Sequence, residues 1–229
     1  IAGGGTTSSL GVEQFHERGI TGDEVRIGVI DSGFDTNTPG IASNVVDQRQ
    51  FADPRSTSHG TGVAQVVTQT APDASLYLAT AQGPTDVAAA LRYFAEQEAD
   101  IVVTSIGYPE LDDDGQHLLA QPIASAQANG ITYINAAGNS RQTHWEGRFI
   151  DTNGNDAHEF NNNGDERQCT PSCNVTAPSG QFFAVLDWKR EGDGSEYQIG
   201  LYDPNTESVF RLSTERFQTQ DNNRQVIST

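Results

Sequence analysis

Methionine is absent from the sequence, and lysine occurs once, at Lys189. The lack of methionine even at position 1 predicts a processed or cut chain, from which a signal peptide and a pro-segment have been removed. Basic residues are scarce as a class: 13 lysines and arginines stand against 31 aspartates and glutamates, which gives a formal net charge of −18. A surface of this sign repels nucleic acid and anionic membranes, so we expect neither as a partner.

The surplus of acidic residues has two interpretations. One is a protein from a halophile, in which high salt screens the repulsion between like charges. The other is an ordinary secreted protein from a genome biased towards arginine. We favour the halophilic interpretation, because a net charge of −18 disfavours a compact fold at low salt.

Long hydrophobic runs are missing, and cysteines are few. No segment reaches the apolar length of a membrane span. The two cysteines, Cys169 and Cys173, lie in CTPSC. They are too few for a zinc site, and their spacing differs from that of a CxxC redox pair. We therefore predict a small loop closed by a disulfide, which indicates an extracellular, secreted protein.

Apolar runs of strand length alternate with helical patterns over the first 140 residues. Predicted strands cover Val25–Ser32, Ser75–Ala81, Asp100–Gly107 and Ile131–Asn139, and predicted helices cover Gly62–Gln69, Thr85–Ala99 and Leu118–Gly130. We expect Thr85 to be the N-cap of its helix, with Asp86 in the first turn. The pattern predicts an α/β fold with a mostly parallel sheet and helices on both faces. A ligand crevice then lies beyond the carboxyl ends of the strands.

The pattern changes after Asn139. A polar segment rich in Asn, Asp and Gly comes first, and short alternating runs follow at Gln181–Trp188, Glu196–Pro204 and Glu207–Thr214. Turn clusters separate these runs, which predicts a small antiparallel β-sandwich module. We place the boundary near Ser140, so that residues 1–140 form the α/β domain and residues 141–229 form a β-rich insertion module.

Three polar residues come at the ends of the predicted elements. Asp31 ends the first strand, His59 follows 28 residues later at the start of a helix, and Asn139 ends the fourth strand. Each alone has an ordinary structural interpretation, as a capping aspartate, a turn histidine beside glycines, or a Gly-Asn turn. Their order and their sheet context favour one shared site.

The segments that carry these residues are VIDSGFD, SHGTGVAQVV and NAAGNS. They resemble the signatures of the subtilisin-like serine proteases (subtilases), which have an Asp in D-S/T-G, a His in H-G-T-x-V-A and an Asn in A-A-G-N. GITGDEVRIGVIDSG and IVVTSIG also resemble the family's approach to its Asp and its substrate-lining strand. The resemblance covers Gly11 to Ser140 and implies a subtilisin-like fold and an endopeptidase that acts on polypeptides.

The resemblance implies a role for each matching residue. His59 is expected to be the general base that takes a proton from a serine and returns it to the leaving amine. Asp31 is expected to accept a hydrogen bond from the other ring nitrogen, and the hydroxyl of Ser32 to support that carboxylate. Asn139 is expected to donate its side-chain amide to the developing oxyanion. This chemistry requires no cofactor.

The resemblance also implies how substrate is bound. Gly60 and Gly62 are expected to let the backbone pack closely around the histidine. Backbone groups along the peptide are expected from Ser105, Ile106 and Gly107. The primary specificity pocket is expected to be walled by Ala137 and Gly138.

One signature of the family is missing. Its nucleophile lies in a G-T-S-x-A-x-P stretch after the Asn, and this chain has no such stretch. GTTSS at residues 5–9 precedes the Asp, and Ser195 lies in GDGSEYQ, which reads as a hairpin turn with no apolar helix after it. We therefore expect the nucleophile beyond Thr229. The chain is then the N-terminal part of a catalytic domain, inactive alone, with the C-terminal part of that domain as its partner.

Two further hypotheses stay open. DTNGND, at Asp151–Asp156, alternates oxygen ligands as a calcium loop does, but it lacks the distal glutamate of an EF-hand. It is either a structural calcium site or an ordinary acidic turn. For the protein as a whole, the alternatives to a protease are a catalytically dead subtilase-like protein that binds peptides, and a secreted β-module protein with an α/β scaffold.

Overall fold

The computed structural model describes residues 11–108, 117–138, 147–154, 158–159, 183–189, 197–203, 206, 208–212, 215–218 and 222–228. The chain divides into two units, Ile1–Gly138 and Asn139–Thr229. The boundary predicted at Ser140 lies outside the described residues, and the assignment of two domains stays a prediction.

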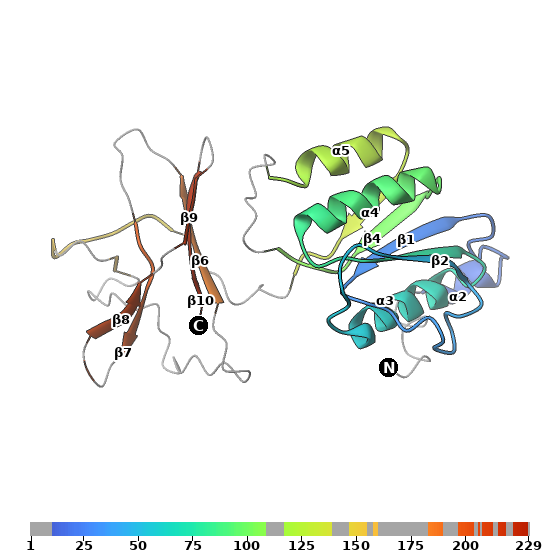
Figure 1. The fold of residues 1–229 in the computed structure, drawn as a ribbon, viewed down its shortest axis with the longest axis horizontal. Helices are drawn as coiled ribbons and strands as arrows, with labels where there is room; N and C mark the ends of the chain where they lie inside the picture. Colours follow the sequence, from blue (N-terminus) through green and yellow to red (C-terminus); the bar gives the residue numbers. More distant parts are fainter. Residues whose placement is uncertain are drawn as a thin grey trace. The chain divides into compact units, whose positions relative to one another are not determined.

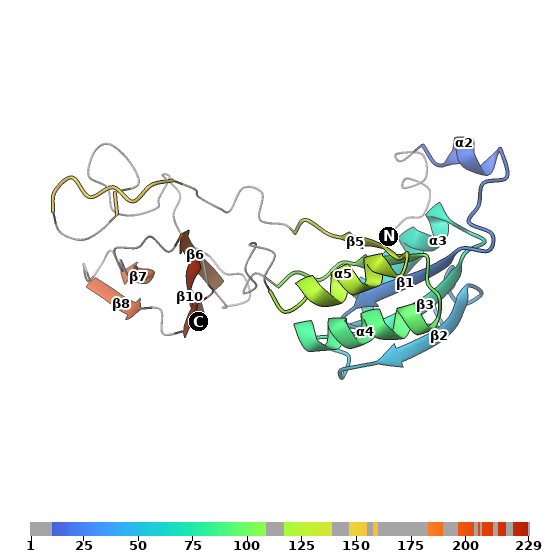
Figure 2. The ribbon, with the colours of Figure 1, turned by 90° about the horizontal axis from the view of Figure 1, so that it is seen from above.

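The first unit is built on a five-stranded sheet in which every pairing is parallel. Figures 1 and 2 show it from two directions. The strands, in spatial order, are β2 (Val45–Gln50), β3 (Ser75–Thr80), β1 (Arg26–Asp31), β4 (Ile101–Thr104) and β5 (Thr132–Asn135). The sequence-based prediction of a mostly parallel sheet with helices is therefore confirmed.

Helices cover both faces of this sheet, as Figure 1 shows. The helices are α2 (Glu13–His16), α3 (Thr57–Thr70), α4 (Pro84–Glu96) and α5 (Ala120–Ala128). On β1, Val29 belongs to the core cluster beneath α3, and Ile30 belongs to the cluster beneath α4 and α5. Successive side chains on a strand point to opposite faces, so the run of buried residues in β1 fills both cores.

The edge strand β2 and the short helix α2 were not predicted from the sequence. In β2, VVDQRQ mixes apolar and polar residues, and its side chains are only partly buried. It is held by parallel pairing with β3 along Val45–Gln50. An edge strand with a solvated side carries a weak hydrophobic signal, because pairing rather than burial stabilises it.

The predicted N-cap at Thr85 is wrong. Helix α4 begins at Pro84, and Gly83 is the N-cap. The carboxylate of Asp86 accepts the backbone N–H groups of Gly83 (2.9 Å) and Gln82 (3.0 Å). Proline is favoured in the first helical turn because it lacks an N–H, and the aspartate satisfies two donors just outside the helix, so the helix starts earlier than the predicted cap.

The other elements are found close to the predicted places with different ends. Helix α3 begins at Thr57, five residues before the predicted start, so His59 lies in its first turn. Strands β4 and β5 end at Thr104 and Asn135, before the predicted ends at Gly107 and Asn139. Each strand ends on a polar residue, and the pairing between the two strands stops at this position, where Thr104 lies opposite Asn135.

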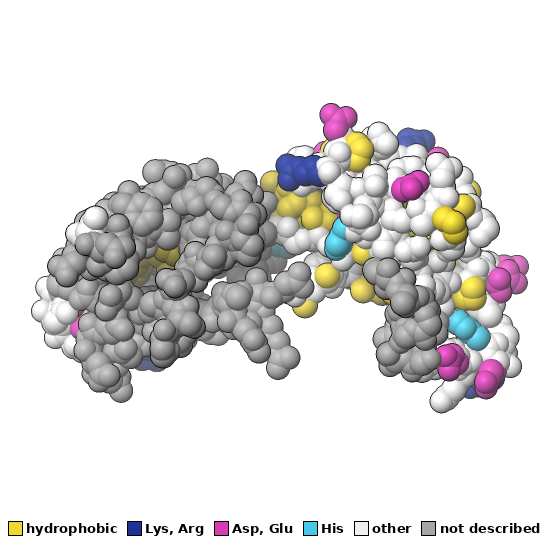
Figure 3. All heavy atoms as spheres, turned by 90° about the horizontal axis from the view of Figure 1, so that it is seen from below, with side chains coloured by type: hydrophobic (Ala, Val, Ile, Leu, Met, Phe, Trp, Pro, Cys, Tyr) yellow, Lys and Arg dark blue, Asp and Glu magenta, His cyan; other side chains and the backbone are white. Residues whose placement is uncertain are grey.

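Hydrophobic side chains remain exposed in this unit. Ile134 on β5, at the end of the sheet, is 49 % exposed. Figure 3 shows one face of the molecule, on which hydrophobic, acidic and some basic side chains of the described residues reach the surface. Within the described part of the chain, no helix is long and apolar enough to cross a bilayer.

Among its described residues, the second unit contains two antiparallel sheets. One has the order β6 (Phe183–Lys189), β10 (Asn222–Ser228) and β9 (Glu215–Gln218), and the other pairs β7 (Gly200–Asp203) with β8 (Ser208–Leu212). Strands β6, β7 and β8 fall within or next to the three predicted runs, whereas β9 and β10 were missed. The antiparallel pairing is confirmed, and the packing of the two sheets into a sandwich stays a prediction.

Candidate active site

Asp31 is a buried carboxylate at the carboxyl end of the central strand. It is the last residue of β1, and its side chain is 1 % exposed. Oδ1 accepts hydrogen bonds from the backbone N–H of Ser32 (2.7 Å) and from the Ser32 hydroxyl (3.1 Å). A buried charge is costly unless hydrogen bonds replace its water, and these two bonds supply part of that replacement.

His59 also contacts this carboxylate. Its Nδ1 lies 2.9 Å from Oδ2 and 3.0 Å from Oδ1 of Asp31. The carboxylate only accepts, so the proton lies on Nδ1, which leaves Nε2 with a lone pair for a second proton. The His59 side chain is 58 % exposed. The pair therefore joins a buried orienting acid to a base that solvent or substrate can reach.

Gly60 allows the close approach between the two segments. A Cβ at this position would lie 2.3 Å from the carbonyl oxygen of Gly33 and 2.8 Å from Cβ of Asp31. Neither distance is possible for a real side chain, so only glycine fits here. Gly62 is also buried in α3. The expectation of close packing next to the histidine is thus met at Gly60.

Thr61 also stabilises the site, and this role was not predicted from the sequence. Its hydroxyl donates to the carbonyl oxygen of Thr57 (2.6 Å) and accepts the backbone N–H of Asp35 (2.8 Å). It therefore ties the first turn of α3 to the segment that follows Asp31. A threonine inside HGTG gives no sequence signal for this role beyond its place in the motif.

The predicted substrate residues follow β4 and β5 at the same edge of the sheet. Thr104 pairs with Ile30 on β1 and with Asn135 on β5, so these strands end side by side near Asp31. Ser105 and Ile106 are half-buried, and the others are exposed: Gly107, Ala137 and Gly138. Asn139 lies outside the described residues. The structure thus places five of the predicted substrate residues at this edge and leaves their contacts with a substrate as a prediction.

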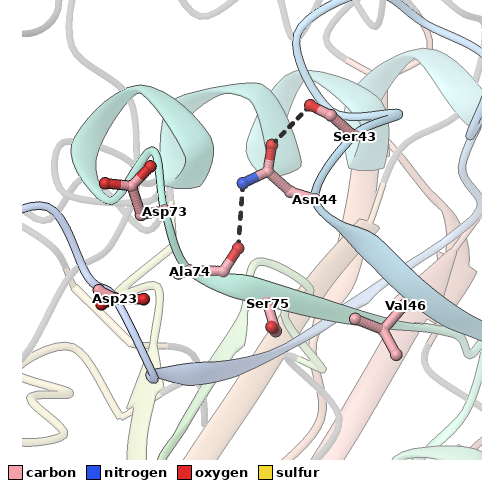
Figure 4. Close-up of a pocket in the computed structure, with 7 residues that line it drawn as sticks. All are labelled: Asp23, Ser43, Asn44, Val46, Asp73, Ala74 and Ser75. Atoms are coloured by element: carbon pink, nitrogen blue, oxygen red, sulfur yellow. Dashed lines mark hydrogen bonds between the residues drawn. The ribbon is translucent and has the colours of Figure 1, made fainter.

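The hollow drawn in Figure 4 lies at the opposite end of the sheet. Its lining residues are Asp23, Ser43, Asn44, Val46, Asp73, Ala74 and Ser75. Strand β3 begins at Ser75, and Asp31 pairs with Thr80 at its other end. The amide of Asn44 donates to the carbonyl oxygens of Pro72 (2.7 Å) and Ala74 (3.0 Å), so its role is structural. The candidate catalytic residues lie instead at the carboxyl edge of the sheet.

Among the described residues, no group of three or more His, Cys, Asp or Glu side chains could hold a metal ion. In the candidate calcium loop, Oδ1 of Asp151 accepts the backbone N–H of Gly154 (2.7 Å), which is the geometry of an ordinary turn. Asn155, Asp156 and both cysteines lie outside the described residues. Calcium binding and the disulfide stay predictions.

Comparison with known proteins decides the family. The model of the Subtilase family matches residues 22–178. The chain belongs to the subtilase family. The Asp31–His59 pair of this subtilase lies inside the matched segment.

The chain is also similar to individual proteins. The chain is 25 % identical to the major intracellular serine protease of Bacillus subtilis (strain 168) over 147 residues, covering 53 % of this chain and 45 % of that protein. Among solved structures it is similar to a cold adapted subtilisin-like serine proteinase (TM-score 0.43, 21 % identity, 52 % of this chain and 48 % of that one). It is also similar to a lanthipeptide protease (TM-score 0.48, 20 % identity, 56 % and 44 %). The subtilase chain spans about half the length of these relatives.

Proposed function

We propose that the protein is a serine endopeptidase of the subtilisin type. The observation that carries the proposal is the hydrogen bond of 2.9 Å between Nδ1 of His59 and the buried carboxylate of Asp31. This is the acid–base half of a catalytic triad, in a member of the subtilase family. Polypeptides are the proposed substrates, and no cofactor takes part in the chemistry.

The proton path follows from this geometry. Nε2 of His59 takes the proton of a serine hydroxyl while the serine oxygen forms a bond to the carbonyl carbon of the substrate. The imidazolium then gives that proton to the leaving amine as the C–N bond breaks. In the second half of the reaction, His59 takes a proton from water as the water oxygen bonds to the acyl carbon, and returns it to the serine oxygen as the C–O bond to the serine breaks. Asp31 stabilises the imidazolium and holds its tautomer. Asn139 is the proposed donor to the oxyanion.

Binding of the peptide is proposed at the ends of β4 and β5. Ser105, Ile106 and Gly107 would pair with substrate as an added strand, and Ala137 and Gly138 would border the specificity pocket. Ser105 and Ile106 are held in place, because they continue directly from β4 and Ile106 packs against the buried core. Gly107 offers backbone groups without a side chain that would block the peptide.

The nucleophile is proposed to lie outside these 229 residues, so that they do not hydrolyse peptides alone. No G-T-S-x-A-x-P stretch follows the histidine. The proposed partner is the C-terminal part of the catalytic domain. Secretion, adaptation to high salt and a structural calcium at Asp151–Asp156 are also proposed, from the composition and the loop pattern alone.

A catalytically dead peptide-binding protein is the second candidate, favoured by the same missing nucleophile motif. The two candidates differ in one measurable property. A protease cleaves the peptides that bind to the carboxyl edge, whereas the alternative binds them unchanged.

The test is to replace the acid–base pair in the full-length protein. His59→Ala and Asp31→Asn should each lower kcat by about 10⁴-fold or more, the scale known from triad removal in subtilisin itself. A fluorophosphonate probe should label one serine outside residues 1–229. Gln65→Ala, which changes another residue of α3, is the matched control and should retain activity. Probe labelling within residues 1–229, or turnover that survives His59→Ala, would contradict the proposal.

A further inference from the structure

Gln82 joins the segment after Asp31 to the loop that leads to His59. It follows β3 by two residues, and its side chain is partly buried. Its Nε2 donates to the carbonyl oxygen of Asp53 (3.1 Å) and lies 3.5 Å from the carbonyl oxygen of Ser32. One side-chain amide with two N–H groups therefore reaches both segments.

The two segments are the ones whose separation matters for the acid–base pair. Ser32 directly follows Asp31, and Asp53 belongs to the exposed loop that enters α3 just before His59. The backbone N–H of Arg55 donates to the carbonyl oxygen of Ser32 (3.1 Å). The loop is thus joined to the Asp31 turn directly at Arg55 and, through the side chain of Gln82, at Asp53.

The amide of Gln82 is itself held on a rigid support. The backbone N–H of Ala81 donates to the carbonyl oxygen of Asp31 (2.9 Å). The backbone N–H of Gln82 donates to the carboxylate of Asp86 in the first turn of α4 (3.0 Å). The side chain thus extends from a point fixed by β1, β3 and α4, and the partner it restrains is an exposed loop.

We propose that Gln82 is a positioning residue for the Asp31–His59 pair. It restrains the Asp53–Ser56 loop against the Asp31–Ser32 turn, and so keeps Nδ1 of His59 within hydrogen-bond distance of the carboxylate. This inference rests on the proposed function, because it assigns Gln82 to the alignment of the acid–base pair. It requires no contact between Gln82 and substrate. Lengthening the contact by about 1 Å would cost up to ~100-fold in rate.

The test replaces Gln82 and observes His59 directly. In the full-length protein labelled with ¹⁵N-histidine, the neutral His59 ring of the wild type should carry its proton on Nδ1. Gln82→Ala and the nearly isosteric Gln82→Glu, which keeps the shape and loses both donors, should shift population to the Nε2-protonated tautomer. The same variants should lower kcat by about 10- to 100-fold with little change in KM.

Gln65 gives a matched control, because its Nε2 also donates to a backbone carbonyl oxygen, that of Pro39 (3.3 Å), from the same helix as His59. Gln65→Glu should leave the His59 tautomer and kcat unchanged. Gln82 variants with wild-type ¹⁵N spectra and kcat would overturn the positioning role, as would a Gln65→Glu variant that shows the same loss. A wild type in which His59 lacks the Nδ1 proton would instead overturn the proposed function.

Discussion

Asp31 and His59 form a pair with unequal access to solvent. The carboxylate is 1 % exposed and the imidazole is 58 % exposed. Burial keeps the carboxylate away from competing water, so its hydrogen bonds to His59 and Ser32 are stronger than they would be at the surface. The exposed ring remains free to approach a hydroxyl. This asymmetry fits the proposed role of His59 as a general base whose tautomer is fixed by Asp31.

Gly60 is predicted to be intolerant of any side chain. Gly60→Ala places a Cβ 2.3 Å from the carbonyl oxygen of Gly33, and the forced shift should lower the free energy of unfolding by about 1–3 kcal/mol. The shift should also separate Asp31 from His59 and reduce activity. Urea unfolding measures the stability.

The control for this prediction is Gly107→Ala. A Cβ at Gly107 meets no described atom within 4 Å, and the same substitution there should leave the stability within about 0.5 kcal/mol of wild type. Equal losses at the two glycines would show that the packing at Gly60 is not the cause.

At the scale of elements, Tyr93 links helix α4 to the edge strand β2. Tyr93 is 2 % exposed, and its hydroxyl donates to Asp47 of β2 (2.8 Å). The guanidinium of Arg49, two residues further along β2, lies 4.9 Å from the centre of the Tyr93 ring. A strand with little buried surface is thus held by aromatic and polar contacts to the helix above it.

The stability of this contact is predicted to fall at alkaline pH. Burial, with the hydrogen bond to Asp47, raises the pKa of Tyr93 above its ordinary value. The unfolded tyrosine ionises near pH 10, so stability is fully present below about pH 10 and is lost as the pH rises towards the folded pKa. Urea unfolding between pH 8 and pH 11 measures this slope.

Tyr93→Phe is the variant that isolates the effect. It should cost about 0.5–1.5 kcal/mol at neutral pH, because the hydrogen bond to Asp47 is lost, and it should flatten the alkaline slope. Part of the slope should persist, because burial also raises the pKa of Tyr133. A variant whose slope equals that of the wild type would assign the alkaline loss to other groups.

The elements differ in how far the sequence predicts them. The buried strands β1, β3 and β4 read as near-continuous apolar runs, because both faces of a parallel sheet are covered. Strand β2 has no such run and depends on its pairing with β3, which no local pattern reveals. The start of α3 was missed for a similar reason: the segment from Thr57 to Thr61 has no apolar pattern, and Thr61 is held by a hydrogen bond from the distant Asp35.

In the candidate site, too, some residues are predicted by sequence motifs and others are revealed only by the fold. The order of the motifs predicts that Asp31 and His59 lie at one edge of the sheet. The structure places Nδ1 of His59 2.9 Å from Oδ2 of Asp31. Gln82 and Thr61 act through hydrogen bonds to backbone groups of distant segments. Such contacts depend on the assembled fold, since any residue supplies a backbone carbonyl, so the sequence gives no specific partner for them.

At the scale of the whole molecule, two features oppose stability in dilute buffer. The formal net charge is −18, and like charges repel one another more in a compact fold than in an extended chain. The sheet of the first unit also leaves Ile134 of β5 about half exposed. Salt weakens the repulsion between the acidic side chains, whereas the exposure of Ile134 does not involve charge. The two contributions to stability can therefore be separated by varying ionic strength.

We predict that thermal stability rises as NaCl or KCl increases from dilute to molar. The Debye length falls from ~30 Å at 0.01 M to ~3 Å at 1 M, with ~10 Å already reached at 0.1 M. Most of the gain from screening should therefore come at the lower concentrations. Calorimetry or circular dichroism at fixed pH gives Tm across the series. Chloride salts are the right choice, because sulfate also strengthens apolar burial.

Sucrose provides the control for general stabilisation, because it favours the compact state without screening charge. If repulsion dominates, chloride at low concentration should raise Tm more than sucrose does. A protein adapted to high salt should continue to gain stability towards molar concentrations, whereas an ordinary secreted protein with an acidic surface should level off once its charges are screened. A Tm that stays flat or falls from dilute to molar chloride would remove the halophilic interpretation, because the charge of −18 would then carry no measurable cost at low ionic strength.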